Sequence, residues 1–339
     1  MSFDPSGFAV HNGNFLGLPW SPEESEIVLL GLPWDVTTSY RDGTSRGPQA
    51  VIDASYQLDF SNPFLERGWE TRIATLPISR DWLEKNRDLR EKASRWISFL
   101  EKGGDPSHPE MRKLLDGINE GNEKFHQWVE EECARWLDRG KRVVALGGDH
   151  SVSFGAIKAV ALRTPVSILH IDAHADLRDA YEGFHHSHAS IMFNARKIPG
   201  VHNIVQVGIR DWSPDEEKII RESGITTFFD WDLRAARARG ITWHEQCDRI
   251  LEKLGPKVYL SFDIDGLDPR FCPHTGTPVP GGLDHWEALY LLNRVVESGK
   301  ELVGADLVEV APGPEGSEWD ANVGARTLYA ICQLIKKSG

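Results

Sequence analysis

Short, continuously apolar runs recur along the chain and alternate with longer amphipathic stretches. The runs occupy residues 26–34, 142–148, 166–174, 203–211, 226–232, 257–265 and 301–312. Because these runs do not alternate with polar residues, they predict strands whose two faces are both covered. The amphipathic stretches 213–224 and 283–300 begin with a Ser or Asp cap, which indicates helices. This rhythm predicts an α/β fold, a three-layer α/β/α arrangement around a mostly parallel central sheet.

Residues 80–140 depart from this rhythm because they contain no strand-like run. Apolar residues instead recur at helical spacing from Trp82 to Leu100 and again from Phe125 to Leu137, with a loop at 103–111 between them. A length of 339 residues suits one large α/β domain or two smaller ones. We therefore expect a helical insertion at about 80–140 within a single domain that spans residues 1–339.

The charge balance limits the classes of partner. The chain has 38 Lys and Arg against 51 Asp and Glu, a formal net charge of -13, which argues against nucleic acid and anionic membranes. No apolar run reaches transmembrane length, and the N-terminus lacks the features of a secretion signal. The four cysteines show no CxxC pairing and are expected to be reduced thiols. A cytoplasmic protein is the resulting expectation.

Three of the predicted strands end in residues that commonly bind metal ions. These are His150 in GGDHS; Asp172, His174 and Asp176 in DAHAD; and Asp263 and Asp265 in SFDIDGLDP. A single Asp at a strand end is usually a helix cap or an ion-pair partner, and a lone His is usually a hydrogen-bonded core residue. The carboxyl ends of parallel strands meet at one edge of the sheet, however, so these groups should converge in one crevice. Their combination predicts a metal site.

The ligand types narrow the choice of ion and of chemistry. Two imidazoles and four carboxylates form an oxygen-rich set that suits Mn²⁺, with Ni²⁺ as the alternative and Co²⁺ or Fe²⁺ also compatible. Six ligands exceed the needs of one catalytic ion and fit two divalent ions that share bridging carboxylates. Such a pair activates water, so the sequence predicts hydrolysis at an electrophilic carbon or phosphorus.

In this order, GGDHS, DAHAD and SFDIDGLDP resemble the motifs of the ureohydrolase superfamily, which includes arginase and agmatinase. Segments 38–48 (TSYRDGTSRGP), 275–283 (TGTPVPGGL) and 306–312 (DLVEVAP) resemble further parts of that family. The resemblance implies an arginase-like fold and an agmatinase-like hydrolase that cleaves a guanidino compound to urea and an amine. It also implies a homo-oligomer, either a trimer or a hexamer.

The same resemblance implies roles for individual residues. One ion would be held by His150, Asp172, Asp176 and Asp263, and the other by Asp172, His174, Asp263 and Asp265. A hydroxide between the ions would attack the guanidinium carbon, with Asp176 orienting it and accepting its proton. Glu309 in DLVEVAP would pair with the planar guanidinium. His188 in HSHAS would act as a proton shuttle at the mouth of the pocket.

Other polar residues close to these motifs are expected to serve the structure. Asp149 should hold His150 by hydrogen bonding, and Asp268 should cap the turn before Pro269. His185 and His186 should be surface or loop residues.

The segment after DAHAD bears on the substrate. DLRDAYEG lacks the Asn-containing loop with which arginases hold the α-carboxylate of arginine, which favours agmatine. Arg178 could bind the carboxylate of a guanidino acid such as guanidinobutyrate, or be a solvated charge. Asp211 could bind an amine, or cap the following helix. Tryptophans 212, 286 and 319 could narrow the pocket rim, which would favour guanidine itself as the substrate of a guanidinase.

Three further interpretations remain open. Formimidoylglutamase chemistry would use the same metal cluster and release formamide instead of urea. A non-catalytic partner subunit is expected to have lost ligands, whereas all six positions and Glu309 are present here. A deacetylase relative of this fold would normally use one zinc ion and would not need the complete set.

Overall fold

Eight parallel strands form one sheet in the computed structural model, which describes residues 4–314 and 316–339. The strands are β1 (Ile27–Gly31), β2 (Ile73–Thr75), β3 (Arg142–Leu146), β4 (Val166–Ile171), β5 (Val201–Ile209), β6 (Thr226–Phe229), β7 (Lys257–Asp263) and β8 (Glu301–Val308). Their order across the sheet is β2-β1-β3-β8-β7-β4-β5-β6. The seven expected strands are confirmed. The edge strand β2 was not expected, because three residues give no recognisable run.

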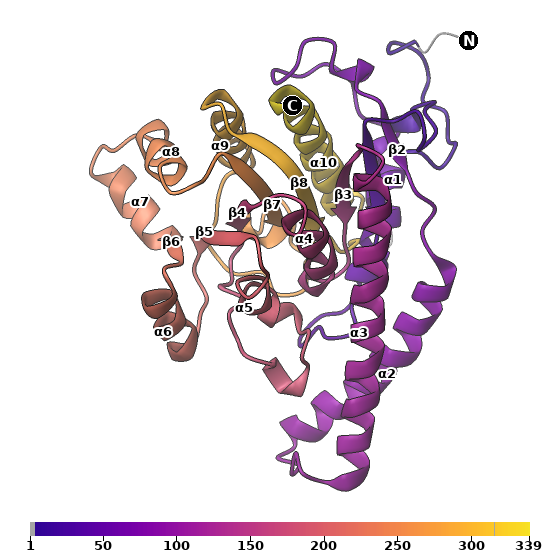
Figure 1. Ribbon diagram of the computed structural model, residues 1–339, viewed down its shortest axis with the longest axis vertical. Helices are drawn as coiled ribbons and strands as arrows, with labels where there is room; N and C mark the ends of the chain where they lie inside the picture. Colours follow the sequence, from indigo (N-terminus) through magenta and orange to yellow (C-terminus); the bar gives the residue numbers. More distant parts are fainter. Residues whose placement is uncertain (1–3, 315) are drawn as a thin grey trace.

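Helices cover both faces of the sheet (Figure 1). They are α1 (Gly47–Ser55), α2 (Arg80–Glu101), α3 (Pro109–Leu137), α4 (Ser153–Ala161), α5 (Ile191–Ala195), α6 (Pro214–Ser223), α7 (Asp230–Ala238), α8 (Trp243–Leu251), α9 (His285–Glu297) and α10 (Trp319–Ser338). Alternate strand residues belong to two different apolar clusters. The cluster that contains Leu29 includes residues of α1, α8, α9 and α10, whereas the cluster that contains Val28 includes residues of α2, α3 and α4. This confirms the three-layer α/β/α arrangement.

The two long helices α2 and α3 form an antiparallel pair that projects beyond the sheet (Figure 1). Ser79 caps α2 by accepting a hydrogen bond from the N–H of Trp82, and Pro109 begins α3. The pair is anchored to the body by aromatic packing, since the rings of Trp34 and Phe125 stack with centroids 4.2 Å apart. The helical prediction for residues 80–140 is therefore confirmed.

Local sequence signals explain where several helices begin. Ser213 and Glu216 form a capping box at the start of α6, and Asp284 and Glu287 form one at the start of α9. Both caps were expected from the sequence. Within the described ranges, no helix combines the length and apolar character needed to cross a membrane. All four cysteines are buried and none is in a disulfide.

The order of the strands determines where the polar strand ends meet. Strands β3, β8, β7 and β4 are consecutive neighbours in the centre of the sheet. Because all four run in the same direction, the segments that leave their carboxyl ends lie side by side. The motifs GGDHS, DAHAD, SFDIDG and VEVAP all follow these four strands.

Candidate metal centre

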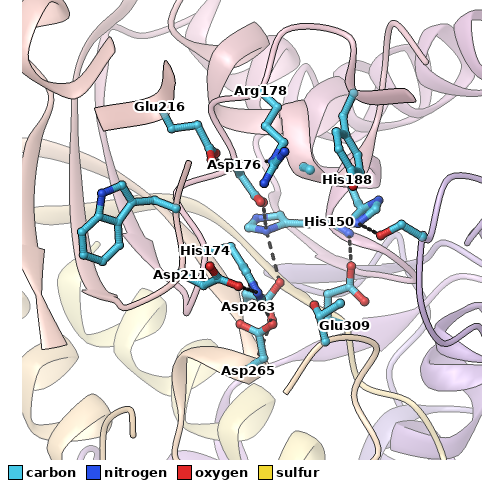
Figure 2. A pocket seen from close by; sticks show the side chains of 15 residues that line it. His150, His174, Asp176, Arg178, His188, Asp211, Glu216, Asp263, Asp265 and Glu309 are labelled. Atoms are coloured by element: carbon cyan, nitrogen blue, oxygen red, sulfur yellow. Dashed lines mark hydrogen bonds and ion pairs between the residues drawn. The ribbon is translucent and has the colours of Figure 1, made fainter. Parts of the chain in front are cut away.

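The structure brings all six expected ligands together at the carboxyl ends of β3, β4 and β7. His150 begins a 3-10 turn after β3, and Asp263 is the last residue of β7. The carboxylates of Asp172, Asp263 and Asp265 are almost completely buried, whereas the side chain of His174 is 22% exposed. Figure 2 shows the side chains of His150, His174, Asp176, Asp263 and Asp265 close together.

Three carboxylates surround one nitrogen of His150. The distances from its Nδ1 are 3.0 Å to Asp172 Oδ2, 3.0 Å to Asp176 Oδ2 and 3.3 Å to Asp263 Oδ2. One ring nitrogen cannot donate a hydrogen bond to three carboxylates at once, and this Nδ1 has no hydrogen-bond partner among the described residues. Such a convergence of buried oxygen and nitrogen atoms is the donor set that a divalent cation requires.

A second group shares Asp172 with the first. His174 Nδ1 lies 3.5 Å from Asp172 Oδ1 and 3.1 Å from Asp265 Oδ2. These three residues place one ligand atom each within 4.8 Å of one another. Asp172 therefore reaches His150 through one oxygen and His174 through the other, as a bridging carboxylate would. Asp263 contacts the second group through its Oδ1, which accepts the Asp265 N–H at 2.8 Å.

The burial of so many carboxylates has electrostatic consequences. Burial raises the pKa of Asp176 to about 7 and that of Asp263 well above its usual range, and neighbouring carboxylates add to both shifts. Burial also favours protonation of Asp172, but the imidazoles of His170, His150 and His174 outweigh it and hold its pKa well below the usual range. Clustered buried anions are costly without compensating positive charge, so the cluster fits divalent cations.

His170 is a member of this cluster that the sequence interpretation missed. Its Nε2 lies 2.7 Å from Asp172 Oδ2, and its Nδ1 accepts a hydrogen bond from Gln206 Nε2 at 3.1 Å. The amide thus leaves the proton on Nε2, where it is donated to the carboxylate. His170 lies on β4 and Asp172 directly follows that strand, two residues further on, so the extended chain puts both on one face, a signal that the sequence did contain.

His150 is held from its other side by a pair of residues that gave no sequence signal. Its Nε2 lies 2.9 Å from Ser261 Oγ, which donates to Asp306 at 3.0 Å. The expected hydrogen bond from Asp149 is wrong. The Asp149 carboxylate instead accepts the N–H of Ser151, because it caps the turn that begins at His150.

The cluster forms the floor of a cavity of about 170 Å³. Its walls include Ser39, Arg178, Tyr181, His188, Asp211, Trp212, Glu216, Thr277 and Glu309. Figure 2 shows Arg178 and Glu216 on one side of the cluster and Glu309 on another. The expected catalytic and substrate-binding residues therefore share one cavity with the expected metal ligands except Asp172, which lies beneath it.

Glu309 is buried and follows β8 in an unusual backbone conformation. Its φ is 61°, and that of Asp176 is 53°, so two of the expected site residues adopt the left-handed region. This conformation costs about 1 kcal/mol or more for a residue with a side chain. Burial and the nearby Asp149 raise the pKa of Glu309 well above its usual range.

His188 borders the cavity and contacts the loop that follows β1. Its backbone N–H donates to Thr37 Oγ1 at 3.1 Å, and its Nε2 lies 3.5 Å from Ser39 Oγ. Burial lowers the pKa of His188 to about 3. The imidazole is therefore neutral near pH 7.

Arg178 and Asp211 occupy the outer part of the cavity. The guanidinium of Arg178 lies 3.6 Å from Glu216 Oε2 and 4.6 Å from the centroid of the Tyr181 ring. Asp211 is largely exposed, with its Oδ2 4.0 Å from His174 Nε2. Arg178 thus already has an anionic partner inside the protein.

Only one of the three expected rim tryptophans borders the cavity. Trp212 does so. The expectation is wrong for Trp286, which stacks on Tyr290 within α9, and for Trp319, whose indole donates to the carbonyl of Arg270. Both lie at the first residues of helices whose sheet-facing stripes begin later, so the two rings remain on the surface.

The remaining expectations concern structural residues. Asp268 Oδ1 accepts the N–H of Arg270 at 3.1 Å, which confirms that it caps this turn. His185 is exposed, and His186 packs against Phe154 with its Nε2 3.0 Å from Glu123. Neither His185 nor His186 borders the cavity.

Comparison with known proteins gives consistent matches. Residues 25–334 match the model of the arginase family. The chain is 34% identical over 294 residues to an N(1)-aminopropylagmatine ureohydrolase of Thermus thermophilus, covering 86% of this chain and 84% of the relative. It is 33% identical to an agmatinase of Bacillus anthracis, over 86% and 85% of the two chains. A crystal structure of a hypothetical agmatinase from Burkholderia thailandensis superposes with a TM-score of 0.72 and 27% identity, over 99% and 96%.

Proposed function

Because the chain belongs to the arginase family, we propose that it is an agmatinase-like hydrolase that cleaves a guanidino compound to urea and an amine. One observation carries this proposal. His150, His174, Asp176, Asp263 and Asp265, five members of the cluster of two imidazoles and four aspartates, line a cavity of about 170 Å³ together with Glu309. A cation-binding cluster opposite a carboxylate is the arrangement that the hydrolysis of a planar cation requires.

Two divalent cations are proposed for this cluster, with Mn²⁺ as the first choice and Ni²⁺ as the alternative. His150, Asp172, Asp176 and Asp263 would hold one, and Asp172, His174, Asp263 and Asp265 the other. When bound, the ions would supply a water molecule activated to hydroxide near neutral pH, the nucleophile that hydrolysis needs.

Residues of the chain would orient the substrate and the attacking water. Glu309 would accept hydrogen bonds from the guanidinium nitrogens and fix its plane. Asp176 would accept a proton from the attacking water and orient it. His188, neutral in its buried position, would hydrogen-bond to the substrate or relay a proton to the leaving amine.

Agmatine is the proposed substrate, because the largely exposed carboxylate of Asp211 borders the cavity and would pair with the far amine of an extended substrate. Two relatives are named for agmatine or an aminopropyl derivative of it. Guanidine is a second candidate, since Trp212 and Tyr181 narrow a small cavity. A guanidino acid is less favoured, because Glu216 already pairs with Arg178. Formimidoylglutamate and a non-catalytic role are not supported by any specific contact.

A screen for urea release tests the proposal. The purified protein is loaded separately with Mn²⁺ and Ni²⁺ and assayed with agmatine, aminopropylagmatine, guanidine, guanidinobutyrate and arginine. We expect urea from at least one compound, with agmatine or its derivative the best. Formamide release from formimidoylglutamate, or no turnover of any compound with two metals bound per chain, would contradict the assignment. Light scattering of the same sample tests the expected trimer or hexamer.

A further inference from the structure

The loop at residues 177–188 forms one wall of the cavity in an unfavourable backbone conformation. It contributes Arg178, Tyr181 and His188 to the lining. Within it, Ala180 has a φ of 45° and Glu182 a φ of 55°, although neither is a glycine. Residues with side chains avoid this region, so the loop needs support from outside to keep its shape.

The α2–α3 helix pair supplies that support. Asn119 of α3 donates from Nδ2 to the carbonyl of Gly183 at 3.0 Å, and its Oδ1 accepts the N–H of His185 at 3.0 Å. Trp96 of α2 donates from its indole to the carbonyl of Glu182 at 2.7 Å. Two buried side chains from two helices therefore bind three backbone groups within four consecutive loop residues.

Packing adds to these hydrogen bonds. A Cβ on Gly183 would lie 2.8 Å from the Leu115 side chain, so the loop touches α3 directly. Phe184 is completely buried in the same apolar cluster as Trp96 and Leu115. The loop is thus held to the helix pair along its tip, at the residues with left-handed backbone.

Helix α2 also holds the loop after β1, which contributes Ser39 to the cavity lining. Asn86 accepts the N–H of Asp35 at 2.8 Å and donates to its carboxylate at 2.8 Å. Arg90 Nη1 donates to the carbonyls of Val36 and Thr38 at 3.0 and 2.5 Å. This loop carries the Ser39 hydroxyl that lies near His188. One helix pair therefore contacts both loops.

We propose that the α2–α3 pair determines which guanidino compounds the cavity accepts, and that Asn119 and Trp96 are its positioning residues. This inference rests on the proposed function. The reacting guanidinium would meet the metal cluster and Glu309, which stand at strand ends. The far end of the substrate would meet Arg178 and Tyr181, which stand on the held loop. Loosening the loop at residues 182–185 should therefore alter selectivity and KM more than metal binding or kcat, because His188 at the end of the loop is held separately by Thr37.

The test compares Asn119→Ala, Asn119→Asp and Trp96→Phe with Asn122→Ala. Asn122 is completely buried in the same helix and has no hydrogen-bond partner among the described residues, so it controls for the loss of a buried amide. The aspartate variant keeps the size and the acceptor of Asn119 but loses the donor. Three quantities are measured for each variant. They are the metal content, the hydrogen–deuterium exchange of residues 177–190, and kcat and KM for agmatine, guanidine, guanidinobutyrate and arginine.

In Asn119→Ala we expect the ratio of kcat/KM between the best and second-best substrate to fall about tenfold, as two hydrogen bonds are lost. The change should come mainly from KM, metal content should match wild type, and residues 177–190 should exchange faster. Asn119→Asp and Trp96→Phe should show smaller shifts in the same direction, and Asn122→Ala none.

Unchanged selectivity and exchange in all three loop variants would overturn the inference, and so would an equal change in Asn122→Ala. If the wild-type protein releases urea from no compound, the proposed function fails instead. The hydrogen–deuterium exchange data then test the positioning role of Asn119 on their own. That role requires residues 177–190 to exchange faster in Asn119→Ala than in Asn122→Ala.

Discussion

The carboxylate of Glu309 accepts a hydrogen bond from the backbone N–H of His150, with 2.9 Å between N and Oε1. The two residues follow β8 and β3, which are neighbours in the sheet. Glu309, which is proposed to bind the guanidinium, is therefore fixed by the turn that carries His150, a proposed metal ligand. This contact fixes the Glu309 carboxylate relative to His150.

Replacing Glu309 with Gln should weaken substrate binding and leave the metals in place. The Gln carbonyl can still accept from His150, but the negative charge opposite the guanidinium is lost. We expect kcat/KM to fall about 10- to 100-fold, corresponding to one charge-assisted interaction. Steady-state kinetics and metal analysis check this, and a wild-type KM would show that another group binds the guanidinium.

Asp172→Ala should remove the ligand common to both groups. Because its two oxygens face His150 and His174, both ions should be lost, and turnover should fall by at least about three orders of magnitude. Metal content per chain and urea release are measured together. Asp268→Asn, which alters an acid that caps a turn outside the cavity, is the matched control. Retained turnover with two bound ions would refute the ligand assignment.

His188→Asn should slow turnover while metal content stays at the wild-type level. We expect kcat to fall by about a hundredfold, the lower end of the usual effect of a proton-transfer group. Burial lowers the pKa of His188 to about 3. The dependence of kcat on pH between pH 5 and 9 should therefore have the same shape in wild type and variant. An ionisation seen in wild type but absent from the variant would show that His188 titrates in the working enzyme.

Buried His126 should make the fold sensitive to acid. Burial and the adjacent His186 hold its pKa well below the usual range, and neither ring nitrogen has a hydrogen-bond partner among the described residues. The unfolded chain binds a proton there below about pH 6.5 while the folded chain does not. Stability is therefore fully present above that pH and is lost below it, by up to about 1.4 kcal/mol per pH unit.

This contribution is measured by comparing denaturant unfolding at pH 7.5 and pH 5 for wild type and His126→Phe, both loaded with the same metal. The variant should lose less stability than wild type between the two pH values. His202→Gln, on the exposed start of β5, should behave like wild type. Parallel losses in all three proteins would exclude His126 as the source.

Removing the metals should lower thermal stability as well as activity. The buried aspartates repel one another unless cations compensate them. A ligand that binds only the folded state stabilises it by about 2.7 kcal/mol at a hundredfold excess over its Kd, so chelation should lower the Tm of a chain of this length by about 4 °C. Asp172→Ala should show no such shift with chelator. An unchanged wild-type Tm would argue against a metal at this cluster.

The sequence predicted the parts of the fold and site that depend on local pattern. Each of the seven expected strands carries an apolar run. The convergence of the ligands was predictable because parallel strands end at one edge of the sheet. Strand β2 could not be predicted from Ile73–Thr75, because three residues define no periodicity. The exposed positions of Trp286 and Trp319 depend on how α9 and α10 are rotated against the sheet, which neighbouring motifs do not reveal.

The supporting residues of the site depend on strand neighbours that are distant in sequence. Ser261 and Asp306 lie opposite each other on β7 and β8, and they reach His150 only because β8 lies between β7 and β3. The role of Asn119 depends on a loop more than 60 residues away. No spacing rule within the sequence connects such partners.

The central position of β8 has a consequence for when the proposed cations can bind as the chain folds. Residues 301–308 follow the other strands in the sequence, yet they separate β3 from β7 in the finished sheet. Until they insert, β3 and β7 are not held in their final positions, so His150 does not stand beside Asp263. The proposed cations would therefore meet a complete cluster only after β8 has entered the sheet.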